Sequence, residues 1–141
     1  MNKVSGFKIC GYVDCAPLKL KLLTADSRIS SKEYDEVVKK GETHILIDVR
    51  PSHHYKIVSL PKSTNIPLAN LEDRLLEISF ELKSKGIHDA PDAGIYVVCR
   101  RGNDSQRAVQ LLHKMGFTSA KDIVGGLESW AHDVDQRFST Y

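Results

Sequence analysis

Three short and largely apolar runs most constrain how this chain of 141 residues can fold. They cover residues 45–49, 95–98 and 122–124, and segments with apolar residues at helical spacing separate them. Apolar runs of this length are typical of strands that are buried on both faces. Because helical segments alternate with these strands, we predict an α/β fold in which helices cover both faces of a mostly parallel sheet.

Capping and turn residues locate the helices more closely. Ser30 and Glu33 form a capping box, which predicts a short helix that ends at Gly41. A helix is expected over residues 71–86, and another follows residue 99 and ends at Gly116. A final helix begins after residues 125–126. A short strand is also expected around residues 66–68, and residues 84–94 are typical of a surface loop.

The chain is expected to contain one domain with a lead-in segment. Residues 1–28 have no sustained periodicity, so we interpret them as a linker or strap before a domain that spans residues 29–141. A chain of 141 residues with 41% hydrophobic residues can bury a core of ordinary size.

Charge and hydropathy exclude several classes of function. The formal net charge of +2 is too small to indicate a nucleic-acid partner. No apolar stretch approaches the length of about 18 residues that a membrane helix needs. Residues 1–6 also lack the apolar core of a signal peptide. We therefore expect a cytoplasmic chain that binds neither membranes nor nucleic acids directly.

Cys99 is the residue whose position most favours chemistry. It follows a strand and precedes a helix, and the loop between them contains Arg100, Arg101, Gly102, Asn103, Asp104 and Ser105. Backbone amides and the positive end of a helix dipole converge at such a position and favour a thiolate. The two arginines would strengthen this effect, and Asp104 would partly oppose it. We interpret Cys99 as a nucleophile; the alternative is that it is only the last buried residue of its strand.

Other polar residues near this loop have structural or supporting interpretations. Asp48 and Arg50 follow another strand, and because the carboxyl ends of parallel strands share one edge, we expect them to support the site. Asp104 is as well explained by capping the next helix as by contact with a partner, and Ser105 competes for that cap. We interpret the adjacent His53 and His54 as surface residues, because neighbours on a helix point in different directions.

The remaining cysteines, Cys10 and Cys15, leave two possibilities open. Their spacing lacks the usual two-residue metal pattern, and no histidines complete a ligand set, so we expect no zinc site from this chain alone. They form either a small local disulfide or a pair of free thiols.

The motifs, taken in order, resemble those of rhodanese domains. They are Asp48-Val49-Arg50, residues 55–67, the loop after Cys99, and residues 125–130, and the resemblance covers residues 29–138. Ser59 and Lys62 stand where that family usually has histidine and glycine. The resemblance implies a three-layer α/β fold with a mostly parallel five-stranded sheet.

Residues 102–106 and 138–141 resemble, more narrowly, the carboxyl-terminal rhodanese-like domains of eukaryotic adenylyltransferases and sulfurtransferases of molybdenum-cofactor synthesis, the plant version among them. This implies that Cys99 carries a persulfide, receives sulfur from a cysteine desulfurase or another donor, and accepts thiosulfate in vitro. The acceptor would be the adenylated terminal glycine of a ubiquitin-fold carrier, such as the small subunit of molybdopterin synthase or the modifier used in tRNA thiolation.

The same resemblance also concerns cofactors and the strap. In those proteins an activating domain with ATP and zinc sites precedes the rhodanese domain, so we expect no cofactor in this chain. The segment that contains Cys10 and Cys15 matches the linker between the two domains.

Two other functions compete with this interpretation. A cysteine phosphatase or arsenate reductase uses a similar loop, but binding of a phosphate dianion favours an arginine six positions after the cysteine, where this chain has Ser105. A non-catalytic rhodanese-like interaction module is the other alternative, and such modules usually lack the cysteine.

Overall fold

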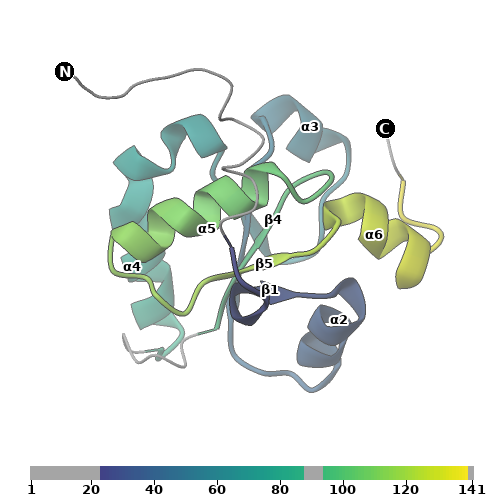
Figure 1. The fold of residues 1–141 in the computed structure, drawn as a ribbon, viewed down its shortest axis with the longest axis horizontal. Helices are drawn as coiled ribbons and strands as arrows, with labels where there is room; N and C mark the ends of the chain where they lie inside the picture. Colours follow the sequence, from purple (N-terminus) through teal and green to yellow (C-terminus); the bar gives the residue numbers. More distant parts are fainter. Residues whose placement is uncertain (1–22, 88–93, 140–141) are drawn as a thin grey trace.

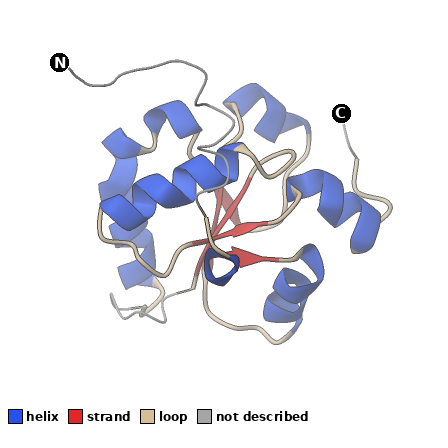
Figure 2. Ribbon diagram, in the orientation of Figure 1, coloured by secondary structure: helices blue, strands red, loops and turns tan. Residues whose placement is uncertain are grey.

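A computed structural model describes residues 23–87 and 94–139. In this part of the chain, five strands form one parallel sheet in the order β1-β5-β4-β2-β3 (Figures 1 and 2). The strands are β1 (Arg28–Ile29), β2 (Ile45–Asp48), β3 (Ser63–Asn65), β4 (Ile95–Val98) and β5 (Lys121–Ile123). The prediction of an α/β fold with a parallel five-stranded sheet is therefore confirmed.

Helices connect successive strands and cover the sheet. They are α2 (Ser31–Lys39), α3 (Ser52–Ile57), α4 (Leu75–Ser84), α5 (Asp104–Lys114) and α6 (Gly126–Asp133). Short 3-10 turns at Ala25–Ser27, Leu68–Asn70 and Glu72–Arg74 complete the connections. In Figure 1, α4 and α5 lie on one side of the sheet, and α2 and α6 lie on the other.

The central strands are buried on both faces because alternate side chains enter different cores. Ile47 and Val97 point toward α4 and α5, where they pack with Ile78 and Leu112. Leu46 and Val98 of the same strands point the other way, toward α2 and α6. There they belong to a second core with Tyr34, Val37, Leu127 and Trp130. This alternation explains why β2 and β4 appear as nearly continuous apolar runs in the sequence.

The capping box predicted at the start of α2 is confirmed. The backbone N–H of Glu33 donates to Ser30 Oγ at 3.1 Å, and the Ser30 N–H donates to the Glu33 carboxylate at 2.9 Å. Gly41, with φ 70°, follows the end of the helix as expected.

Other boundaries differ from those predicted. The strand expected at residues 66–68 lies at Ser63–Asn65, because it is an edge strand of polar residues and Pro67 instead begins a 3-10 turn. The helix expected over residues 71–86 is interrupted, since a 3-10 turn precedes α4. Helix α3 was not predicted; it buries none of its residues and so has no apolar periodicity.

Two residues of the segment interpreted as a strap also contribute to the fold. Arg28, which the sequence placed in the strap, lies in β1, where it is opposite Asp122 of β5. Leu23 packs against the core beneath α4 and α5. A strand of two residues carries too short a pattern to be recognised from the sequence.

Candidate active site

The Cys99 side chain lies at the carboxyl end of β4, enclosed by the loop that leads to α5. Cys99 is only 4% exposed. The backbone N–H groups of Gly102 and Ser105 donate to Cys99 Sγ at 3.0 and 3.3 Å. Both amides belong to the turn that enters α5, where the helix dipole is positive. This loop can therefore stabilise negative charge on sulfur.

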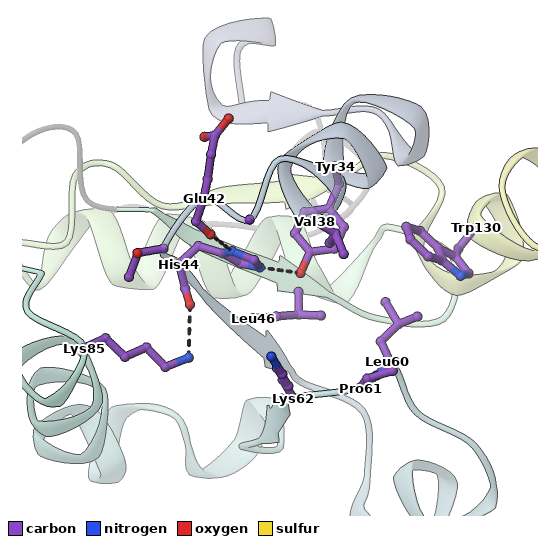
Figure 3. Close-up of a pocket in the computed structure, with 12 residues that line it drawn as sticks. Tyr34, Val38, Glu42, His44, Leu46, Leu60, Pro61, Lys62, Lys85 and Trp130 are labelled. Atoms are coloured by element: carbon purple, nitrogen blue, oxygen red, sulfur yellow. Dashed lines mark hydrogen bonds between the residues drawn. The ribbon is translucent and has the colours of Figure 1, made fainter.

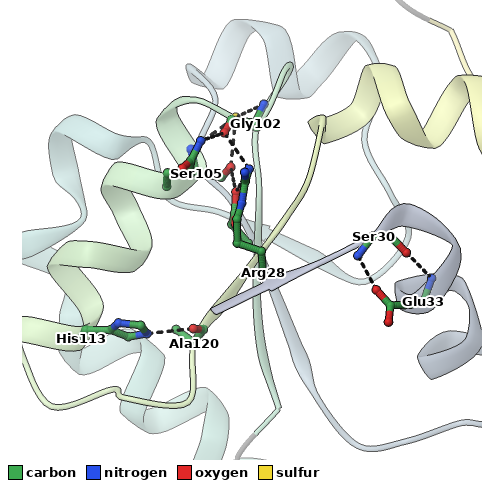
Figure 4. Close-up of polar contacts among 10 residues, drawn as sticks. Arg28, Ser30, Glu33, Gly102, Ser105, His113 and Ala120 are labelled. Atoms are coloured by element: carbon green, nitrogen blue, oxygen red, sulfur yellow. Dashed lines mark hydrogen bonds and ion pairs between the residues drawn. The ribbon is translucent and has the colours of Figure 1, made fainter. Parts of the chain in front are cut away.

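A chain of side-chain contacts runs from Cys99 to the far edge of the sheet. The thiol contacts Ser105 Oγ at 3.4 Å, and the Ser105 hydroxyl donates to Asp122 Oδ2 at 2.8 Å. Ser105 and Asp122 are both fully buried. Arg28 donates to both oxygens of Asp122, at 2.8 and 3.0 Å. Figure 4 shows Arg28 extending from β1 toward Gly102 and Ser105.

The loop backbone is held from behind by neighbouring elements. Arg28 and the Gln106 amide both donate to the Gly102 carbonyl oxygen, at 3.3 and 2.8 Å. At the start of α6, the N–H groups of Leu127 and Glu128 donate to the carbonyl oxygens of Cys99 and Arg100, at 2.9 and 3.0 Å.

Gly126 makes this close approach of α6 possible. A Cβ atom on Gly126 would overlap the backbone of Cys99 and Arg100, and its φ is 61°. The sequence indicated only that residues 125–126 form a turn. In the structure, Gly126 has the further role of allowing two backbones into contact.

The arginines of the loop are paired with an acidic residue of α6. Arg100 and Arg101 approach Glu128 Oε2 at 3.5 and 3.0 Å, and all three side chains are at least 40% exposed. They add positive charge beside the loop, as expected, but Glu128 offsets part of that charge.

Neither Asp104 nor Ser105 caps α5, so the capping alternative for these two residues is wrong. Asn103 is the N-cap of α5, and it makes no side-chain capping bond. Asp104 instead pairs with Arg107 at 2.7 Å, one turn along the helix. Ser105 is turned inward toward Cys99 and Asp122.

Asp48 and Arg50 form a buried ion pair at the end of β2. Their closest atoms are 2.7 Å apart, and both side chains are at most 2% exposed. Arg50 also donates to the Val58 carbonyl oxygen, and Asn65 of β3 donates to the carbonyl oxygens of both Asp48 and Arg50. The pair therefore fixes the corner between β2 and α3, and Arg50 lines the cavity beside Cys99.

This cavity has a volume of about 380 Å³ and opens above the sulfur. Four arginines contribute to its lining: Arg50, Arg100, Arg101 and Arg107. His54 also lines it and is partly buried, so its interpretation as a surface residue needs correction. Desolvation, the neighbouring His53 and the charges of Arg50 and Arg100 lower the pKa of His54 below its usual value. The cavity thus suits a small anion or an extended, negatively charged chain end.

Another cavity of about 380 Å³ lies among α2, β2 and α6 and has mostly apolar walls (Figure 3). His44 Nδ1 donates to the Glu42 carbonyl oxygen at 2.7 Å, and His44 Nε2 lies 2.8 Å from the Tyr34 hydroxyl. Burial raises the pKa of Tyr34 well above its usual range, so the hydroxyl stays protonated. Among the described residues that line this cavity, none is a cysteine and none belongs to the loop after β4.

No group of three or more histidine, cysteine or acidic side chains in residues 23–87 and 94–139 could hold a metal ion. None of the helices in this part of the chain is long and apolar enough to span a bilayer. Cys10 and Cys15 lie outside the described residues.

Several residues of this site were not predicted as part of it. Arg28 was assigned to the strap, Asp122 was interpreted only as part of a strand, and Glu128 belonged to a motif without a role. The sequence did contain a signal for Asp122. An aspartate within an otherwise apolar strand indicates a buried carboxylate, and buried carboxylates require partners.

Comparisons with known proteins agree with this geometry. Residues 30–133 match the model of the rhodanese-like domain. The chain is 61% identical over 127 residues to the adenylyltransferase and sulfurtransferase MOCS3 of Arabidopsis thaliana, covering 86% of this chain and 27% of that protein. It is 38% identical over 135 residues to the adenylyltransferase and sulfurtransferase UBA4 of Candida albicans, covering 94% of this chain and 28% of that protein.

Solved structures agree on the fold. The human single-domain sulfurtransferase TSTD1 is similar with a TM-score of 0.63 and 24% identity, covering 76% of this chain and 96% of that one. The chain spans about a quarter of the length of the curated relatives described above. The match over residues 30–133 and these identities show that the chain belongs to the rhodanese-like domain family.

Proposed function

We propose that this domain is a sulfurtransferase in which Cys99 carries the transferred sulfur as a persulfide. The observation that carries the proposal is the pair of backbone amides directed at Cys99 Sγ, at 3.0 and 3.3 Å, on the floor of an open cavity lined by arginines. The similar proteins of Arabidopsis thaliana and Candida albicans are both named sulfurtransferases, which supports the same class of reaction.

Sulfur loading follows from this geometry. The Cys99 thiolate attacks the sulfane sulfur of the donor, and the S–S bond of the donor breaks. The electron pair leaves with the donor, as a thiolate for a protein persulfide or as sulfite for thiosulfate. The product anion, Cys99–S–S⁻, occupies the cavity above the loop, where amides and nearby arginines stabilise its charge.

We further propose a ubiquitin-fold sulfur carrier with an adenylated terminal glycine as the acceptor. The terminal sulfur of the persulfide attacks the glycine carbonyl carbon, and AMP leaves with the electron pair. A second thiol then attacks Cys99 Sγ, which releases the carrier as a thiocarboxylate and leaves a mixed disulfide. Carriers of molybdenum-cofactor synthesis and tRNA thiolation, with a cysteine desulfurase as donor, are the proposed partners. The reducing cytoplasm is the proposed location.

Phosphatase chemistry is less well supported. The position where a phosphate-binding arginine would stand is Ser105, which is fully buried and bonded to the Asp122 carboxylate. A phosphate dianion on this loop would lie close to that carboxylate, without a guanidinium group from the same position to balance it.

Mass spectrometry of the intact protein tests the proposal. In a background with Cys10→Ser and Cys15→Ser, incubation with thiosulfate should add one sulfur atom that cyanide removes. Cys99→Ser in the same background should add none, because no other thiol remains. Labile sulfur on the Cys99→Ser protein, or phosphatase turnover by a Cys99 protein that acquires no sulfur, would overturn the assignment.

A further inference from the structure

The sulfur chemistry described above does not use the buried carboxylate and guanidinium group behind Ser105. Asp122 is 0% exposed, and the side chain of Arg28 is 23% exposed. The two lie on the adjacent strands β1 and β5 and contact the cysteine only through Ser105. An ion pair that served only to join two strands would not need a hydroxyl group of the nucleophile's own loop as a third partner.

The Ser105 hydroxyl has different hydrogen-bonding requirements in the two ionisation states of Cys99. With a protonated thiol, its oxygen accepts from the S–H group while its hydrogen goes to Asp122 Oδ2, as the distances of 3.4 and 2.8 Å describe. A thiolate has no hydrogen to donate and needs donors itself. The same hydroxyl can supply one by rotating its hydrogen from the carboxylate to the sulfur.

Arg28 allows this rotation without leaving the carboxylate unsatisfied. Its Nε donates to Oδ1 at 2.8 Å and its NH2 group donates to Oδ2 at 3.0 Å. Each oxygen of Asp122 therefore keeps a charged donor after the serine hydrogen leaves. A buried carboxylate without these bonds would hold the serine hydrogen far more strongly.

We propose that Arg28 and Asp122 are positioning residues that set the ionisation of Cys99 by controlling the direction of the Ser105 hydroxyl. Asp122 holds the hydroxyl in the orientation that suits the thiol, and Arg28 weakens that hold so that the thiolate can compete for the hydrogen. This inference rests on Cys99 being the reacting group of the proposed function.

Other charged groups also act on the sulfur, and the test must separate their effects. The cavity side presents Arg50, His54, Arg100, Arg101, Asp104 and Arg107, and Glu128 of α6 pairs with two of these arginines. These groups face the sulfur across the cavity. Among the residues that the structure describes, only Asp122 reaches the sulfur through a hydrogen-bonded hydroxyl, so its effect should depend on Ser105.

The test measures the rate of Cys99 alkylation by iodoacetamide against pH, with Cys10→Ser and Cys15→Ser in every protein. Ser105→Ala removes a donor to the thiolate, so the pH midpoint should rise by about one unit. Asp122→Asn removes a negative charge and releases the hydroxyl, so the midpoint should fall. Arg28→Gln leaves the carboxylate uncompensated, so the midpoint should rise, and Arg28→Lys should restore part of the shift.

A double substitution separates this mechanism from a simple charge effect. In the Ser105→Ala background, Asp122→Asn should shift the midpoint by less than half of its effect in the parent protein, because Asp122 has lost its connection to the sulfur. Arg74→Gln is the matched control, since Arg74 also pairs bidentately with a carboxylate, Glu77, and is 35% exposed, but it does so at the start of α4. Its midpoint should equal that of the parent.

Circular dichroism and thermal melting identify variants that do not fold. If Asp122→Asn fails to fold, the rises expected for Ser105→Ala and Arg28→Gln and the partial restoration by Arg28→Lys still test the inference. Equal shifts of Asp122→Asn with and without Ser105, or midpoints that do not move in folded variants, would overturn the inference. Alkylation does not require sulfur transfer, so failure of the proposed function would appear separately, as a protein that shows these shifts but acquires no sulfur.

Discussion

Lys62 is the one residue other than glycine that has a positive φ within residues 23–87 and 94–139, at 64°. It lies in the turn before β3, at a position where rhodanese sequences usually have glycine. A side chain in this conformation costs about 1–2 kcal/mol through contact between Cβ and the backbone. Lys62, where this chain departs from the family pattern, is therefore a site of local strain.

Lys62→Gly should stabilise the domain by about 0.5–1 kcal/mol, because relief of this strain exceeds the added freedom of glycine in the unfolded chain. Urea unfolding measures the change. Lys62→Ala removes the same long side chain but keeps Cβ, so it should not stabilise. A Lys62→Gly protein that is no more stable than Lys62→Ala would contradict the explanation.

The residues of the site differ in how far the sequence could predict them. Cys99 and its loop follow from a cysteine between a strand and a helix, and Asp48 and Arg50 follow from the end of a neighbouring strand. The contact between Arg28 and Asp122 joins positions 94 residues apart, and it depends on β1 lying beside β5. No local pattern contains that information, and the same is true of the pairing of Glu128 with the loop arginines.

Among the elements, α2 begins with a capping box whose contribution to stability depends on pH. The pKa of Glu33 is lowered, mainly because its carboxylate accepts from the Ser30 backbone N–H and, secondly, through the Ser30 side chain. A carboxyl group with a lowered folded-state pKa stabilises the fold above its unfolded-state pKa, and this contribution is lost as the pH falls through the folded value.

Glu33→Ala should therefore lower the melting temperature at pH 7, and the difference from the parent should shrink as the pH is reduced below the usual range of glutamate. Glu36→Ala, on the same helix but outside the capping box, is the control. Thermal melts at several pH values provide the measurement. A Glu33→Ala deficit that is the same at pH 7 and at pH 3 would argue against a role for the charged carboxylate.

The junction between α6 and the loop after β4 gives a second prediction at this scale. Gly126→Ala should destabilise the domain by about 3 kcal/mol or more, because the added methyl group must displace backbone of Cys99 and Arg100. It should also abolish sulfur loading in any protein that folds, since the amides of Leu127 and Glu128 could no longer hold the loop.

Gly116→Ala separates this overlap from the strain of a positive φ alone. Gly116 has φ 99° and nothing within 4 Å of an added Cβ, so the substitution should cost only about 1–2 kcal/mol. Sulfur loading should persist. Equal losses of stability in the two variants, measured by urea unfolding, would show that the approach of α6 is not what requires glycine at position 126.

At the scale of the whole molecule, the cavity by Cys99 is positive although the net charge of the chain is only +2. Glu128 restrains this local field by pairing with Arg100 and Arg101. Glu128→Gln should therefore raise the efficiency of thiosulfate use a few fold at low ionic strength, and Arg100→Ala/Arg101→Ala should lower it roughly ten fold.

Both effects should diminish as salt is added, because the groups are exposed and their charges are screened. Glu77→Gln, which releases Arg74 at the start of α4 in the same way, should leave thiosulfate use unchanged. Turnover measured at two ionic strengths checks the prediction. A response to Glu128→Gln that does not depend on salt would indicate a structural effect instead, as would a large loss of stability.

The global fold was more accessible from the sequence than its edges were. The alternation of buried strands and helices predicted the parallel, three-layer arrangement because both central strands are apolar on each face. The edge strands β1 and β3 are short and only partly buried, so they lack that pattern. Strand order was also beyond reach without the family resemblance, since it depends on which long-range pairings are most stable.

The adjacency of the first and last strands has a consequence for synthesis on the ribosome. β1 pairs with β5, and the carbonyl groups of Cys99 and Arg100 bind amides of residues 127 and 128. A nascent chain that has exposed Cys99 but not yet α6 therefore lacks the contacts that hold the loop behind the thiol. Because domains fold as units, we expect the loop around Cys99 to reach this arrangement only after α6 has been synthesised.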